Sequence, residues 1–162
     1  MNAVDMLMYG QRTVRATIDR YTADDWDRIA LGVWTAKDLL GHLAAFEVRY
    51  ADVLATFVGA PLESDLMSAD PRTFNDDQAA IRGPWPIDDV MAEFLAANER
   101  VMRHARVITP DVWREVGTIP WYGAEYSLDD LTVYQMYGHK REHDPQLSAV
   151  LERAAVEAGS SG

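Results

Sequence analysis

The feature that most constrains this chain is a run of apolar side chains that alternates steps of four and three residues. This spacing places them along one face of an α-helix and is typical of a helix packed in a bundle. Thr35 and Asp38 precede the run in the pattern of an N-terminal capping box, and Gly59 follows it, so the sequence predicts a helix over 35–58. The run consists of Leu39, Leu43, Phe46, Tyr50, Val53 and Phe57.

Three more long helices are predicted by the same reasoning. Apolar side chains recur at helical spacing over 2–21 and 87–108, and a Ser127-Leu-Asp-Asp130 cap opens a helix that extends to residue 158. Pro145 predicts a kink or a restart in that last helix. The terminal Gly-Ser-Ser-Gly, residues 159–162, is predicted to be a disordered tail.

The connection between helices two and three is long and rich in proline and glycine. It runs from Gly59 to Pro86, with one short predicted helix at 74–81. Such a stretch can run the length of a bundle, so helices two and three are predicted to lie parallel. The predicted fold is therefore all-α: one four-helix bundle domain over residues 1–158, with a long crossover between helices two and three.

A weak internal repeat suggests a pseudo-twofold bundle. A threonine and two tryptophans of the first half recur 87 residues later in the second half: Thr22, Trp26 and Trp34 match Thr109, Trp113 and Trp121. The alternative is that helical proteins reuse caps by chance. Most of the tryptophans are expected to plug the ends of the bundle.

Composition excludes several classes of protein. The 162 residues include no cysteine, which excludes disulfides, thiolate zinc sites, iron–sulfur clusters and a cysteine nucleophile. The net charge of −11 argues against a nucleic acid partner, because phosphate contacts need clustered lysine and arginine. No apolar run is long enough to span a membrane and no secretory signal is recognised, so a cytoplasmic protein is expected, without membrane association.

Three of the four histidines are predicted to face one interior. His139 and His143 are four residues apart and share a helix face, and His42 on a neighbouring helix lies at the edge of the apolar stripe. Three imidazoles can hold one metal ion and leave a ligand position open for chemistry. The alternatives are solvated residues or partners in core hydrogen bonds. His104 lies well off its apolar stripe and is predicted to be a surface residue.

Other polar or aromatic residues are predicted to line a pocket near these histidines. Gln11 and Asn98 lie near the centres of otherwise apolar helix faces, and Glu142 lies between the paired histidines as a hydrogen-bond acceptor, an acid–base group or an ordinary intrahelical partner. The candidate pocket residues are Gln11, Trp34, Asn98, Gln135, Glu142 and Gln146.

Two segments resemble a known family. Trp34-Thr-Ala-Lys-Asp-Leu-Leu-Gly-His42-Leu-Ala-Ala-Phe-Glu47 and Tyr137-Gly-His139-Lys-Arg-Glu-His143 are similar to the DinB/YfiT-like superfamily of four-helix bundles. The resemblance implies that His42, His139 and His143 bind a divalent metal, commonly nickel or zinc. The superfamily includes thiol-dependent transferases and isomerases, among them mycothiol-dependent maleylpyruvate isomerase, and a ClbS/DfsB-like branch associated with self-protection. This chain departs from the usual pattern at Asp144-Pro145, and it is expected to be the bundle alone, without the isomerase's extra C-terminal domain.

Together these observations predict a metal-dependent enzyme that activates water or a low-molecular-weight thiol for hydrolysis or transfer on a small-molecule substrate. One alternative is a metal-free module that binds or sequesters a small molecule in the polar pocket. Another is an interaction protein, for instance a homodimer formed through an exposed helix face. The spacing of residues identifies neither the substrate nor the metal.

Overall fold

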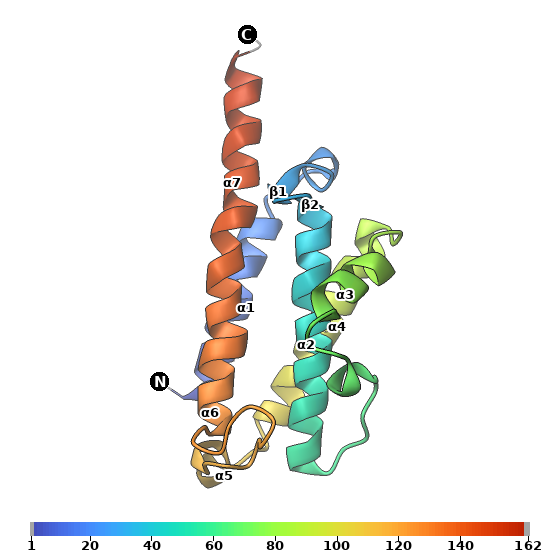
Figure 1. Ribbon diagram of the computed structural model, residues 1–162. Coiled ribbons are helices and arrows are strands. Elements are labelled where there is room, and N and C mark those ends of the chain that lie inside the picture. The colour runs from blue at the N-terminus through green and yellow to red at the C-terminus, as the bar shows by residue number, and fades with distance from the viewer. Residues whose placement is uncertain (1, 161–162) are drawn as a thin grey trace.

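Four long helices pack side by side in the computed structural model, which describes residues 2–160 (Figure 1). They are α1 (Ala3–Ile18), α2 (Ala36–Val58), α4 (Ile87–Ala105) and α7 (Gly138–Ser160). The described part of the chain contains only two short strands, β1 (Ile29–Leu31) and β2 (Trp34–Thr35), which pair antiparallel in a hairpin before α2. The predicted all-α bundle is confirmed.

Helix α2 begins and ends where its sequence predicts. The Thr35 hydroxyl accepts a hydrogen bond from the backbone nitrogen of Asp38, and the Asp38 carboxylate accepts one from the backbone nitrogen of Thr35. Gly59 ends the helix in the left-handed conformation, with φ of +66°, which a residue without a β-carbon adopts at little cost. The length of α2 is therefore set by its capping residues.

The four long helices form two parallel pairs, α2 with α4 and α1 with α7. Helix α2 runs parallel to α4, because Gly41 near its start packs toward Val90, while Glu47 further along pairs with Asn98. Helix α1 runs parallel to α7, and the Tyr21 hydroxyl just beyond α1 donates to the Leu147 carbonyl oxygen at 2.8 Å. The crossover contains the 3₁₀ turn η2 (Leu66–Ser68) and α3 (Phe74–Arg82), which lie along α2 (Figure 1).

The apolar core is divided between the two ends of the bundle. Trp26, which follows the short turn η1 (Ala23–Asp25), is buried among core residues of α1, α2 and α7. Trp113 in α5 (Pro110–Arg114) is buried in the core at the opposite end. Both tryptophans therefore plug the ends of the bundle as expected, whereas Trp121 is exposed.

The fourth helix is continuous but changes its winding. It begins as α6 (Leu128–Leu131), widens into the π-helical segment η3 (Thr132–Tyr137) and continues as α7. The helix does not restart at Pro145, because α7 continues through this residue. Arg141 and Pro145 are both exposed, so water can bind the Arg141 carbonyl that the proline leaves without a donor.

Several helix ends differ from their predicted positions. Helix α1 stops at Ile18, because Asp19 caps it and the next residues form a turn, and α4 stops at Ala105. Helix α7 continues through Gly159 to Ser160, so the predicted tail begins within it, and residues 161–162 lie outside the described part of the chain. Within residues 2–160, none of the helices combines the length and apolar character that a membrane span requires.

Candidate metal centre

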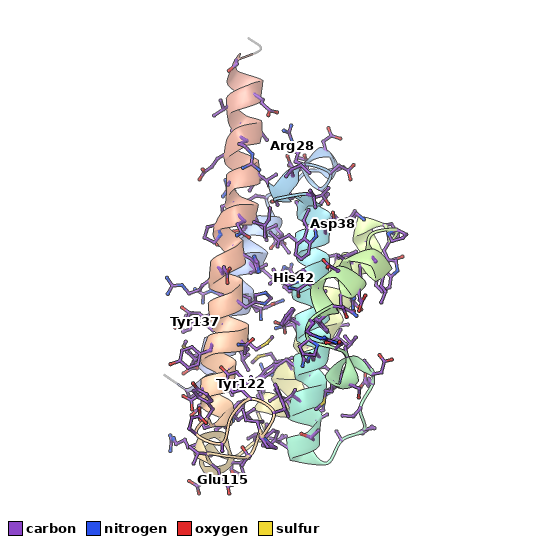
Figure 2. The ribbon with its side chains drawn as sticks, in the orientation of Figure 1. Arg28, Asp38, His42, Glu115, Tyr122 and Tyr137 are labelled. Carbon is purple, nitrogen blue, oxygen red and sulfur yellow. The ribbon has the colours of Figure 1, made fainter. Side chains whose placement is uncertain are left out.

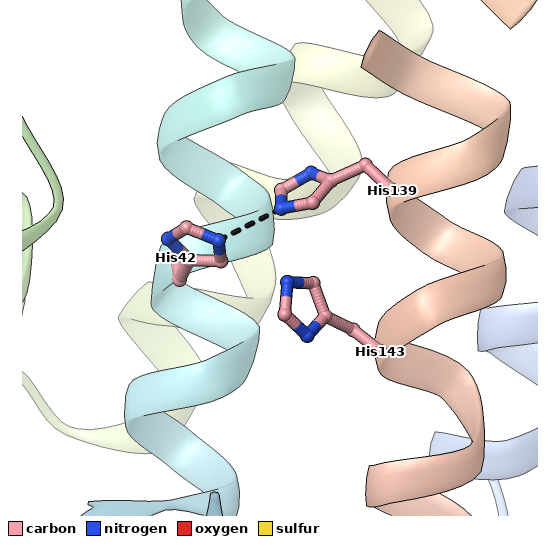
Figure 3. Close-up of side chains that lie close together, drawn as sticks. All are labelled: His42, His139 and His143. Atoms are coloured by element: carbon pink, nitrogen blue, oxygen red, sulfur yellow. Dashed lines mark hydrogen bonds between the residues drawn. The ribbon is translucent and has the colours of Figure 1, made fainter. Parts of the chain in front are cut away.

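The structure brings His42, His139 and His143 together between α2 and α7 (Figure 3). One ring nitrogen from each histidine lies within 4.8 Å of the other two. The Nε2 atoms of His42 and His139 are 2.8 Å apart. Ligand nitrogens about 2.0–2.1 Å from a tetrahedral cation lie about 3.4 Å from one another, so small ring movements would accommodate one ion.

The position of His143 is set by its neighbour one helical turn along α7. Its Nδ1 atom lies 2.7 Å from Oε1 of Gln146. Because an amide oxygen only accepts, Nδ1 is the donor in this contact, and Nε2 is the ring nitrogen that can bind a cation. Figure 3 shows a ring nitrogen of His143 turned toward the other two rings. A cation would satisfy nitrogen lone pairs that otherwise face one another.

The surroundings keep two of these histidines neutral. Burial, reinforced by the nearby His143, lowers the pKa of His42 from 6.5 to about 4. Burial is the main cause that lowers the pKa of His139 to about 2, and the neighbouring His42 is the second. A metal ligand must be unprotonated, so at neutral pH both rings are in the form that binds a cation.

Aromatic rings enclose the histidines. The ring centroid of Trp34 lies 5.0 Å from that of His42, and Phe46 lies 4.9 Å from His42 and 4.4 Å from His139. Trp34 reaches this position because β2 leads directly into α2, and Phe46 is one turn after His42 on the same helix face. The walls therefore limit water access to the three nitrogens.

A cavity of about 330 Å³ opens at this centre. Three of the predicted pocket residues line it together with the histidines: Trp34, Gln135 and Glu142. Glu142 is exposed and supplies the only carboxylate among the described lining residues. Asn75 of α3 also lines the cavity, so the crossover contributes to the site.

The other predicted pocket residues do not line this cavity. Gln146 instead contacts the far side of the His143 ring, and Gln11 is half-buried with its Oε1 atom lacking a hydrogen-bond partner. Asn98 is buried on α4, where its side-chain nitrogen donates to Oε2 of Glu47 at 3.4 Å. The helical wheel placed Asn98 inside the bundle, but it could not indicate which interior neighbours it would meet.

The prediction that His104 lies on the surface is wrong. Its exposed fraction is only 9%, and burial lowers its pKa. The positive charges of Arg100 and Arg103 lower this pKa further. Arg100 forms a buried ion pair with Asp52, whose side chain also accepts from backbone nitrogens of the crossover. Arg100 also pairs with Glu63 of the crossover, so this part of α4 has tertiary contacts that the spacing of one helix does not reveal.

Sequence reasoning missed a buried ion pair beside the centre. Lys140, the residue after His139, pairs with Glu47 of α2, and both side chains are almost completely buried. Phe46 was assigned only to the apolar seam, although it contacts two of the histidines. Charged residues within the apolar run of α2, such as Glu47 and Arg49, were the available signal of interior polar contacts.

Comparison with protein families supplies the decisive observation. A model of the DinB superfamily matches residues 7–147, a span that includes all three histidines and all four long helices in whole or in part. The chain belongs to the DinB superfamily. No significant match was found among curated proteins or among solved structures. DinB membership and the histidine geometry together identify this centre as a potential metal-binding site.

Proposed function

We propose that this DinB-superfamily protein is a metal-dependent enzyme in which His42, His139 and His143 hold one divalent cation. The convergence of three ring nitrogens within 4.8 Å, two of them on rings kept neutral by burial, carries the proposal. Zinc and nickel are the expected metals, because both accept imidazole nitrogen. The absence of cysteine leaves the histidines as the strongest borderline ligands in the chain.

A divalent cation in a three-imidazole set supplies a Lewis acid that can activate water or a low-molecular-weight thiol. The protein's own residues then have separate tasks. Trp34 and Phe46 restrict solvent, and Gln146 orients His143. Glu142 is the carboxylate at the cavity that can take up the proton released by the nucleophile. The proposed reaction is hydrolysis or thiol transfer on a small electrophilic substrate.

Metal content of the purified protein tests the centre. After loading with zinc or nickel and removal of free ion, the wild-type chain should retain one equivalent, and the His139→Ala variant should retain none. His104→Gln is the matched control, because His104 is also buried but does not belong to the cluster. Retention by His139→Ala, or no retention by the wild type, would remove the metal assignment.

Activity is tested separately with simple probes. Hydrolysis of p-nitrophenyl acetate and conjugation of glutathione to 1-chloro-2,4-dinitrobenzene represent the two proposed reaction types. Either activity should appear with metal-loaded protein, disappear after chelation, and fall in Glu142→Gln while the metal is retained. Turnover that is unaffected by chelation would contradict a metal-dependent reaction.

A metal-free binding module is the second candidate, and one observation favours it. The 2.8 Å separation of the His42 and His139 Nε2 atoms is a hydrogen-bond distance, so these rings can pair without a cation. In that case the cavity would bind a small molecule for sequestration. Wild-type protein that takes up no metal but protects a bound probe from reaction would favour this candidate.

A further inference from the structure

A second cavity of about 390 Å³ adjoins the histidine pocket. The two cavities share Phe46 and Gln135 as lining residues. Figure 2 shows His42 and, nearer the α5 end of the molecule, Tyr122, which lines the second cavity. The walls of the second cavity are mainly apolar and aromatic, including Tyr50, Val53, Met67, Trp121, Tyr122 and Leu131. Its volume suits a small organic molecule.

One basic side chain lines this cavity. Arg49 projects from α2, and its guanidinium carbon lies 5.2 Å from the ring centroid of Phe74 and 5.7 Å from that of Trp121. These two rings fix the position of the guanidinium through cation–π contacts. No carboxylate within residues 2–160 forms an ion pair with it, although the sequence holds 26 acidic and 15 basic residues.

The missing partner is unusual for an arginine in this setting. The two most buried arginines, Arg82 and Arg100, both pair with carboxylates. Arg49 is half-buried, and burial lowers the pKa of its guanidinium, which still stays charged at neutral pH. It has therefore lost part of its hydration without gaining an anion. A ligand carboxylate would replace that hydration with two parallel hydrogen bonds.

The position of Arg49 along α2 sets the length of such a ligand. His42, Phe46 and Arg49 lie on the same side of the helix, because they are separated by four and three residues. Seven residues correspond to about 10 Å along the helix axis. A molecule whose acidic group meets Arg49 would extend past Phe46 and place its other end at the histidines.

We propose that the substrate is a small amphiphilic acid, with a flat apolar body in the second cavity and a carboxylate on Arg49. Its reacting end would lie at the three histidines, and that part of the assignment rests on the proposed function. A single guanidinium in an acidic protein matches a monoanion better than a phosphate dianion, whose second charge would find no partner there.

Binding of 4-phenylbutyrate to chelator-treated protein tests the carboxylate subsite without any metal. We expect the wild type to bind this acid at least tenfold more tightly than neutral 4-phenylbutanamide, measured by calorimetry or ligand-observed NMR. Arg49→Gln should abolish this preference, Arg49→Lys should retain part of it, and the exposed-arginine control Arg106→Gln should leave it unchanged. Equal binding of acid and amide by the wild type would overturn the proposal.

Two further comparisons test whether the ligand is a carboxylate and whether its anionic group lies at Arg49. Phenyl phosphate that binds more tightly than 4-phenylbutyrate would overturn the carboxylate assignment. Because the acid-to-amide comparison is made on the wild-type chain, it remains decisive even if an Arg49 variant fails to fold. A preference that persists in Arg49→Gln would place the anion elsewhere and also overturn the proposal.

The metal centre and the carboxylate subsite can be tested independently of each other. His139→Ala should lose metal and keep its preference for the acid, whereas Arg49→Gln should lose that preference and keep one equivalent of metal. Wild-type protein that binds no metal but prefers 4-phenylbutyrate through Arg49 would remove the proposed metal-dependent function and support the carboxylate subsite. Metal binding without any preference for the acid would do the reverse.

Discussion

The Nδ1 atom of His143 lies 2.7 Å from Oε1 of Gln146, one turn further along α7. This contact holds the His143 ring with its other nitrogen turned toward His42 and His139 (Figure 3). A partner of this kind contributes to metal affinity without touching the ion. Gln146 was predicted to line the pocket, and the structure gives it this different contact.

Replacing Gln146 with leucine should weaken zinc binding about 10- to 100-fold, because the His143 ring loses the acceptor that sets its tautomer and orientation. Competition with a chromophoric chelator measures the change. Gln146→Glu should bind at least as tightly as the wild type, since a carboxylate also accepts from Nδ1. Gln135→Leu is the control, because Gln135 lines the cavity without a hydrogen bond to these rings. Wild-type affinity in Gln146→Leu would show that the contact does not orient the ligand.

The metal-free protein should lose stability as the pH falls from about 6.5 to 5. The folded-state pKa of His42 is lowered to about 4, so the unfolded chain binds more protons in this range and is favoured on acidification. The expected loss for His42 is about 2 kcal/mol at pH 5 relative to pH 7. Urea denaturation at several pH values, above the range where most carboxylates titrate, measures it.

His42→Leu is the matched variant for this pH experiment, because it keeps an apolar side chain of comparable size in the same buried position. Its stability should vary less between pH 7 and pH 5 than that of the wild type. The pH dependence of His139 acts in the same direction, since burial also lowers its pKa. A wild-type unfolding free energy that is constant over this range would contradict the assignment of neutral, buried histidines.

Breaking the buried pair between Glu47 and Lys140 should be strongly destabilising. Lys140→Met leaves the Glu47 carboxylate buried without its cation, at a cost of about 3–5 kcal/mol in unfolding free energy. The double variant Glu47→Leu with Lys140→Met should recover much of this loss, because no charge then remains buried. Arg15→Met, which breaks an exposed pair with Asp19, should change stability by only about 0.5 kcal/mol. Equal effects of Lys140→Met and Arg15→Met would contradict the buried pair.

Pro145→Ala should stabilise the protein by about 1–3 kcal/mol, because it restores the backbone donor that α7 lacks at this position. The gain is reduced by the extra freedom of the unfolded chain. Thermal unfolding measures the effect. Pro71→Ala in the crossover lies outside any helix and should give no comparable gain. A lower melting temperature for Pro145→Ala would mean that the proline is needed in α7.

Much of the fold could be predicted because its signals are local. The apolar seam of α2, the Thr35 and Ser127 caps and the left-handed Gly59 are decided by neighbouring residues, and they lie where the sequence predicts. The parallel arrangement of α2 and α4 followed from the length of the crossover. The hairpin formed by β1 and β2 was not predicted, since strands of two or three residues carry almost no periodic signal.

The sequence by itself determined which residues were available as ligands: no cysteine, and a His139–His143 pair on one helix face. Only the tertiary structure decided that His42 meets this pair, that His104 is buried, and that Asn98 joins Glu47 instead of the histidines. Helical spacing fixes the direction in which a side chain points around the axis of its own helix. The depth and rotation at which two helices meet depend on packing along their whole length, and those quantities decide which side chains touch.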